Sequence, residues 1–266
     1  MTAGHAASPP LHGFGFDCVA VKRGSASRCS ATLWAMEAWE RCRLPDDISF
    51  EEWVRYVFDH PVIDPHWWWR DPESGYFQEW DELADTARTL SYITQLFEEP
   101  EGLIQRFTHP QIDQGILFLV SGSSSRHLSV FSDPRLPWAH RRRGIDAMVP
   151  FYEKLIAPVY QNDLGHCEGG PSDPNRPNWA CYMWWDITSM YAGTDDAEND
   201  AVLHVFEEVL KLKAESCLES VLHGLGHWYL RIPERTEPIV RRFLQRTDIS
   251  PELRRYAERA AVGRIQ

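Results

Sequence analysis

The segment Glu215–Tyr229 constrains the fold most, because it contains two helical stripes side by side. One stripe is mostly large and apolar: Leu218, Val221, Leu222, Leu225 and Tyr229. The other is mostly small: Cys217, Ser220, Gly224 and Trp228. Such a helix must be covered on more than one side. Gly224 and Gly226 each cost about 1 kcal/mol relative to Ala inside a helix, so we expect a neighbouring backbone to approach them closely.

Helical patterns recur along the chain from residue 48. Ser49 and Glu52 form a capping-box pattern that begins one helix, and Pro61 ends it. A 3.6-residue period predicts a long helix over residues 77–97. We also expect helices at 103–107, 110–120, 138–160 with a kink at Pro150, 178–191, 195–212, from 233 or 236 to 245, and from 251 onward behind a Ser250 cap. Residues 116–119 also match a buried strand, but no partner strand is found and we prefer a helix.

These elements predict an all-α fold. Helices of this length joined by short loops are typical of HEAT-like antiparallel pairs, which would form a compact solenoid or a helical bundle. Residues 1–35 have the composition of a disordered arm, and residues 36–266 are expected to form one helical domain. The Gly- and Pro-rich loop at 160–177 is a candidate sub-boundary, and Met36 is an alternative natural start to Met1.

The C-terminal quarter of the chain resembles the end of a group of uncharacterised bacterial helical proteins. The resemblance rests on the motif ESVLHGLGHW from Glu219 to Trp228 and on L-R-R-Y-A near the end. It extends to about a third of the chain if residues 179–186 are included. The resemblance supports HEAT-like pairing and implies no activity.

Charge and cysteine content limit the classes of partner and compartment. The net charge of −12 argues against general nucleic-acid binding and against an anionic membrane surface. No apolar run approaches the roughly 18 residues that a membrane span requires. The six cysteines form no C-x-x-C pair and follow no cleavable leader, so we expect reduced thiols and a cytoplasmic protein.

Two groups of residues are candidate binding surfaces. Twelve tryptophans are unusually many, and three are consecutive: Trp67, Trp68 and Trp69. Adjacent side chains cannot all face one way, so we expect at least one of the three to be partly exposed. Either the tryptophans pack in the groove beside the next helix, or they contact a ligand or partner. From Arg231 onward nine arginines face five acidic residues, a net +4 that leaves −16 elsewhere. This basic segment, with Arg241 and Arg242, is either a solvated helix face or a docking surface for an acidic partner.

One arrangement has the spacing of metal ligands. Glu219, His223 and His227 lie at i, i+4 and i+8 on one helix face, and the two histidines match the spacing of H-E-x-x-H zinc helices. Gly224 occupies the place of the catalytic Glu in that motif. Further ligands for zinc could come from His166, Cys167 and Cys181. The alternative is structural: each imidazole satisfies a polar group of an adjacent helix, and no cofactor is bound.

Two functional hypotheses follow from these patterns. The first is a helical protein-interaction module, acting as a scaffold, an adaptor or a neutralising partner of another protein, because no catalytic set is complete. The second is a metal-dependent enzyme with its site around His223 and His227.

Overall fold

The structure is a computed structural model that describes residues 48–69, 85–165, 178–193 and 195–265. The chain divides into two units, Met1–Arg41 and Cys42–Gln266, and every described residue belongs to the second. The predicted N-terminal arm and the candidate start at Met36 therefore lie outside the described residues.

Helices are the regular secondary structure of the described residues, which confirms the all-α class. Their bounds are α2 (Phe50–Phe58), η1 (Trp67–Trp69), α3 (Thr86–Glu98), α4 (Gly102–Arg106), α5 (His109–Val120), η3 (His127–Ser132), α6 (Trp138–Asp146), α7 (Met148–Phe151), η4 (Tyr152–Ile156), α8 (Ala157–Tyr160), α9 (Trp179–Tyr182), α10 (Trp184–Ile187), α11 (Asp196–Val209), α12 (Glu215–Tyr229), α13 (Pro233–Phe243) and α14 (Pro251–Ala260). Residues 116–119 lie in α5, so the strand alternative is wrong.

Local capping signals set several of these boundaries as predicted. The Ser49 hydroxyl accepts a hydrogen bond from the backbone N–H of Glu52, whose carboxylate accepts one in return from the Ser49 N–H at 2.9 Å. Ser250 caps α14 by accepting from the Leu253 N–H at 3.2 Å. These short-range bonds satisfy helix-end N–H groups without help from distant parts of the chain.

Three predicted helices differ from those observed. The helix predicted over 77–97 begins only at Thr86, where Asp85 caps it, and residues 77–84 lie outside the described part. The helix predicted over 178–191 is two short helices, α9 and α10, followed by non-helical residues. The single helix predicted over 138–160 with a kink at Pro150 is instead divided: α6 ends at Asp146, Pro150 lies inside α7, and a π-helical turn follows at η4. A proline ring clashes with the carbonyl four residues earlier, which here is that of Asp146.

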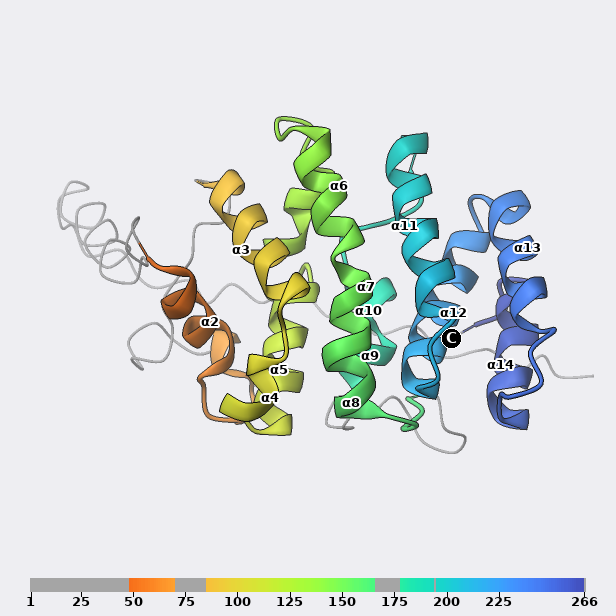
Figure 1. Cartoon of the computed structure of the whole chain (residues 1–266), viewed down its shortest axis with the longest axis horizontal. Coiled ribbons are helices and arrows are strands. Elements are labelled where there is room, and N and C mark those ends of the chain that lie inside the picture. Colours follow the sequence, from red (N-terminus) through yellow and green to blue (C-terminus); the bar gives the residue numbers. More distant parts are fainter. Residues whose placement is uncertain (1–47, 70–84, 166–177, 194, 266) are drawn as a thin grey trace, which may run out of the picture. The chain divides into compact units, whose positions relative to one another are not determined.

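Contacts between helices form two series (Figure 1). In one, α3 packs against α6 and α7, which in turn pack against α11. In the other, α2 packs against α5, α5 against α9 and α10, these against α12, and α12 against α14. Helices that follow one another along the chain thus alternate between the series. One core cluster includes residues on both sides of the candidate boundary at 160–177.

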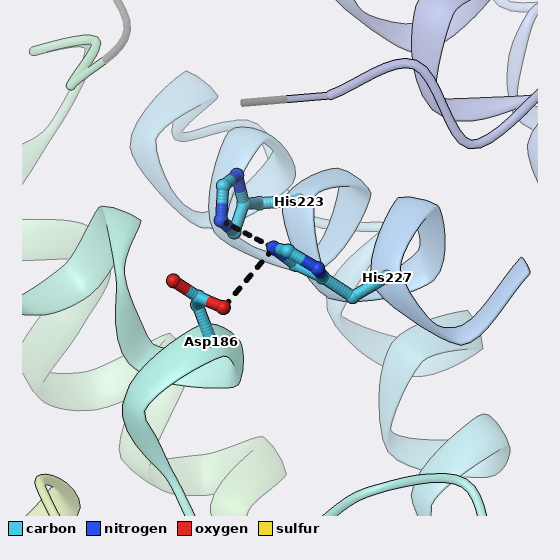
Figure 2. Close-up of side chains that lie close together, drawn as sticks. All are labelled: Asp186, His223 and His227. Atoms are coloured by element: carbon cyan, nitrogen blue, oxygen red, sulfur yellow. Dashed lines mark hydrogen bonds and ion pairs between the residues drawn. The ribbon is translucent and has the colours of Figure 1, made fainter. Parts of the chain in front are cut away.

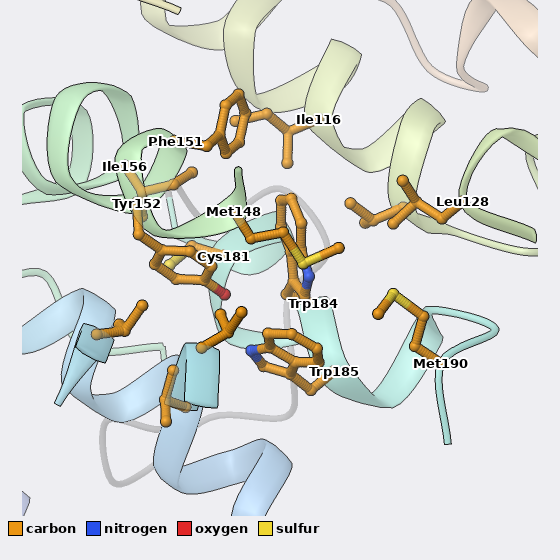
Figure 3. Close-up of a cluster of buried hydrophobic side chains, with 14 of the residues drawn as sticks. Ile116, Leu128, Met148, Phe151, Tyr152, Ile156, Cys181, Trp184, Trp185 and Met190 are labelled. Atoms are coloured by element: carbon orange, nitrogen blue, oxygen red, sulfur yellow. The ribbon is translucent and has the colours of Figure 1, made fainter. Parts of the chain in front are cut away.

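Tryptophan and other aromatic side chains fill the centre of this core. Trp184 and Trp185 of α10 are almost completely buried, and Figure 3 shows them beside Met148, Tyr152 and Cys181. Full burial of a large apolar side chain contributes at least about 1.5–3 kcal/mol, so these rings strongly favour one position of α10. The Tyr152 hydroxyl lies 2.8 Å from that of Ser220, which joins η4 to α12.

Gly224 and Gly226 are closely approached, and the nearest atoms at both are side-chain atoms. A Cβ on Gly224 would lie 2.7 Å from Cγ and 2.8 Å from Cβ of Trp185, and one on Gly226 would lie 2.6 Å from Cγ1 of Ile265. At Gly226 a backbone also comes close, as expected, because a Cβ on Gly263 would lie 3.5 Å from the Gly226 carbonyl oxygen. The missing Cβ of Gly224 makes room for the base of an indole ring, so α10 packs directly on α12.

Candidate metal centre

Two helices bring three metal-ligating side chains together (Figure 2). His223 and His227 lie four residues apart on α12, so their imidazoles project from the same face. Asp186 reaches them from α10. Each of the three offers a ligand atom within 4.8 Å of the other two.

The spacing of these atoms matches the coordination shell of a small metal ion. His227 Nε2 lies 3.1 Å from His223 Nε2 and 3.3 Å from Asp186 Oδ1. In a tetrahedral zinc site with bonds of about 2.0–2.2 Å, neighbouring ligand atoms are about 3.3–3.6 Å apart. Small side-chain adjustments would therefore suffice to place both nitrogens and the oxygen around one ion.

Tyr256 of α14 determines which nitrogen of His223 faces the cluster. Its hydroxyl lies 2.6 Å from His223 Nδ1 and donates toward the Tyr182 hydroxyl at 3.4 Å. Burial raises the pKa of Tyr256 well above its usual value, so the phenol keeps its single proton. In the tautomer in which Tyr256 donates to Tyr182 and accepts from an Nδ1–H of His223, a lone pair remains on His223 Nε2. Outer hydrogen bonds of this kind orient metal-binding histidines.

The cluster is closed on one side and open on the other. His223 is buried with 1% of its surface exposed, whereas the side chains of His227 and Asp186 are 34% and 39% exposed. Water can therefore reach the cluster from the side of His227 and Asp186.

Glu219, the third ligand predicted from helical spacing, lies outside this group. Its carboxylate is fully buried and accepts a hydrogen bond from the Gly165 N–H at 2.6 Å. Of the other predicted ligands, Cys181 is buried and donates to the carbonyl of Ser216 at 3.6 Å, and His166 and Cys167 lie outside the described residues. Sequence analysis missed Asp186 because no spacing rule connects it to the histidines; only the packing of α10 on α12 does.

The predicted binding tryptophans belong to a different part of the molecule. Trp67 and Trp68 are buried, and both rings pack against Phe118 of α5. Trp69 is 57% exposed, in agreement with the expectation that at least one of the three indoles is partly exposed. Of the three, only Trp69 offers its ring surface to a partner.

The predicted binding arginines lie on α13 and form ion pairs. Arg241 pairs with Glu237 at 2.5 Å within the helix, and Arg242 pairs with Glu207 of α11 at 2.7 Å. Arg242 also lines a groove of about 500 Å³, together with Leu210 and Phe243. Both arginines remain about two-thirds exposed.

Comparison of the chain with protein-family models, curated proteins and solved structures yields no match. None of the described helices is long and apolar enough to cross a membrane. The function must therefore be inferred from the side chains themselves.

Proposed function

We propose that this protein binds a divalent transition-metal ion through Asp186, His223 and His227. The convergence of two imidazole nitrogens and a carboxylate oxygen from α10 and α12 carries the proposal. The Tyr256 contact supports it, because it engages His223 Nδ1 and leaves Nε2 as the nitrogen that faces His227. Imidazole ligands favour zinc, iron, cobalt or nickel over magnesium and calcium.

The open side of the cluster supports a catalytic use of the metal. Three protein ligands leave at least one coordination position for water, as in catalytic zinc sites, whereas structural zinc sites use four protein ligands. A bound ion supplies a Lewis acid that lowers the pKa of its water. Asp186 and His227 would hold the ion at the solvent edge while His223 anchors it to the core. We therefore favour a metal-dependent enzyme that activates water.

Elemental analysis and metal titration test this proposal. Protein purified without a histidine tag should contain close to one equivalent of zinc or another first-row ion, and metal-free protein should take up Co²⁺ with the visible spectrum of a nitrogen- and oxygen-bound site. Without a metal, the same side chains would serve only to hydrogen-bond with one another. Absence of stoichiometric uptake would favour that structural role.

Two matched carboxylate variants test which acidic residue binds the metal together with the histidines: Asp186, as in the structure, or Glu219, as helical spacing suggests. Asp186→Asn should weaken Co²⁺ binding at least about 100-fold, because it replaces an anionic ligand by a neutral one. Glu219→Gln should leave the affinity within about threefold of the parent, because Glu219 bonds to Gly165 instead. The reverse pattern would refute the assignment of Asp186. Circular dichroism of both variants verifies that they fold.

A second candidate function is a HEAT-like protein-interaction module in the cytoplasm. Alternation of successive helices between two series of contacts supports HEAT-like pairing. The groove beside Arg242 and the exposed Trp69 offer surfaces for another protein. Burial raises the pKa of Cys217 to about 12, so this free cysteine stays protonated. A tagged pull-down from the native host should recover a protein that Arg242→Glu releases; recovery unaffected by that change would exclude the groove.

A further inference from the structure

A second pocket lies along α14 and the turn that follows it. A pocket of about 400 Å³ there is lined by Arg255, Arg259 and Arg264, by the Tyr256 ring, and by the acidic residues Glu252 and Glu258. It belongs to the basic segment that begins at Arg231. Neither the metal centre nor the groove beside Arg242 includes any of the three arginines.

The backbone after α14 turns sharply and places Arg264 beside the helix. Gly263 has a left-handed φ of +66° and donates its N–H to the Ala260 carbonyl at 3.1 Å. The Arg264 N–H donates to the Arg259 carbonyl at 2.9 Å, which completes a Schellman motif. Beyond the turn, Ile265 packs on α12 at Gly226. The Schellman turn before Arg264 and the packing of Ile265 after it thus fix the backbone of Arg264 beside the pocket.

The arginines of this pocket differ from most others in the described part of the chain. Arg241, Arg242 and Arg246 each pair with a carboxylate. Arg255, Arg259 and Arg264 form no ion pair with any described residue, although Glu252 and Glu258 line the same pocket. The guanidinium of Arg259 instead lies 5.3 Å from the centre of the Tyr256 ring, a cation–π contact that leaves its N–H groups available.

We propose that this pocket binds the phosphate group of a small anionic ligand. Guanidinium groups donate pairs of parallel hydrogen bonds to phosphate oxygens. A carboxylate has only two oxygens and is saturated by fewer arginines, so three guanidiniums lining one pocket favour phosphate. Three arginines and two acidic residues give the pocket a net charge of +1, in a chain whose net charge is −12.

The proposal is independent of the metal centre, so it is tested on metal-free, full-length protein. Inorganic phosphate is titrated by isothermal calorimetry at constant ionic strength, with sodium chloride as the reference salt. Arg259→Gln should weaken phosphate binding about tenfold or more, because it removes a charged donor. Arg259→Lys should weaken it less, since it keeps the charge and loses the planar fork.

Arg231→Gln is the matched control, because exposed Arg231 also has no ion-pair partner among the described residues and lies outside the pocket. This variant should bind phosphate like the parent. Equal losses in Arg231→Gln and Arg259→Gln would overturn the proposal and indicate only a diffuse basic surface. Phosphate heats no larger than those of chloride would also overturn it, leaving the arginines to complement the negative end of the α14 helix dipole.

Discussion

Two histidines of the described residues are almost fully buried, and their surroundings differ. His127 lies among aromatic rings: its Nε2 accepts a hydrogen bond from Trp53 Nε1–H at 3.1 Å, and the Phe118 ring centre is 5.5 Å away. His223 points Nε2 toward His227, beside the Asp186 carboxylate. Burial alone therefore does not identify a functional histidine. What distinguishes His223 is the convergence of further ligand atoms.

Removal of either imidazole should lower stability, but only removal of the His223 imidazole should abolish stabilisation by Zn²⁺. His127→Ala should lower the unfolding free energy by about 3–5 kcal/mol, because it leaves a cavity among rings and removes the acceptor of the Trp53 N–H. Excess Zn²⁺ should still stabilise this variant, by about 2.7 kcal/mol at 100 times the dissociation constant. Zn²⁺ should not stabilise His223→Ala. Urea unfolding with and without Zn²⁺ measures both; loss of the zinc effect in folded His127→Ala would break the comparison.

Gly224→Ala tests whether the core holds the metal cluster in place. Overpacking against Trp185 should cost about 1–3 kcal/mol and exceed the gain in helix propensity of about 1 kcal/mol, so the melting temperature should fall. Trp185 directly precedes Asp186, so displacement of α10 should also weaken Co²⁺ binding.

Gly226→Ala is the control for that change. Its new Cβ would meet Ile265 as closely as that of Gly224→Ala meets Trp185, so stability should also fall by about 1–3 kcal/mol, but Ile265 lies after α14 and α10 should keep its position. Only the Co²⁺ titrations of the two variants should therefore differ clearly. A melting temperature raised by Gly224→Ala would refute the close contact with Trp185.

A smaller effect is expected from removing one hydrogen bond at each buried histidine. Trp53→Phe and Tyr256→Phe should each cost about 1–2 kcal/mol of stability while keeping an aromatic ring. Only Tyr256→Phe should weaken metal binding, by about 10- to 100-fold, because it removes the group that orients His223. Equal Co²⁺ affinities in the two variants would show that the Tyr256 contact does not prepare the site.

The smallest effect is expected at the edge of the aromatic region around His127. Trp69→Ser should change the unfolding free energy by no more than about 0.5 kcal/mol, because the indole is 57% exposed. Trp67→Ala, two residues earlier in the same short helix, should cost about 3–5 kcal/mol. Urea unfolding distinguishes them, and a large loss in Trp69→Ser would mean that this ring is covered in solution.

Helix positions were predictable where the signals are local. The Ser49 and Ser250 caps and the length of α12 follow from hydrogen bonds and apolar periods within a few residues. The helix predicted over residues 77–97 is confirmed from Thr86 onward, but the apolar period continues across Asp85, whose side chain caps the start of that helix. The hydrogen bond from the Arg88 N–H to the Asp85 side chain, and not the apolar period, therefore sets the start of α3.

The sequence by itself determined that His223 and His227 share one helix face, because 3.6 residues per turn leaves no other outcome for an i, i+4 pair. The same rule also put Glu219 on that face, yet a helix turn separates it from the histidines and Gly165 engages its carboxylate. Only the tertiary structure selected Asp186, which is distant along the chain and meets the histidines through the packing of Trp185 against Gly224. Spacing along a helix is a local property of the backbone, whereas proximity between helices depends on which side chains fill the space between them.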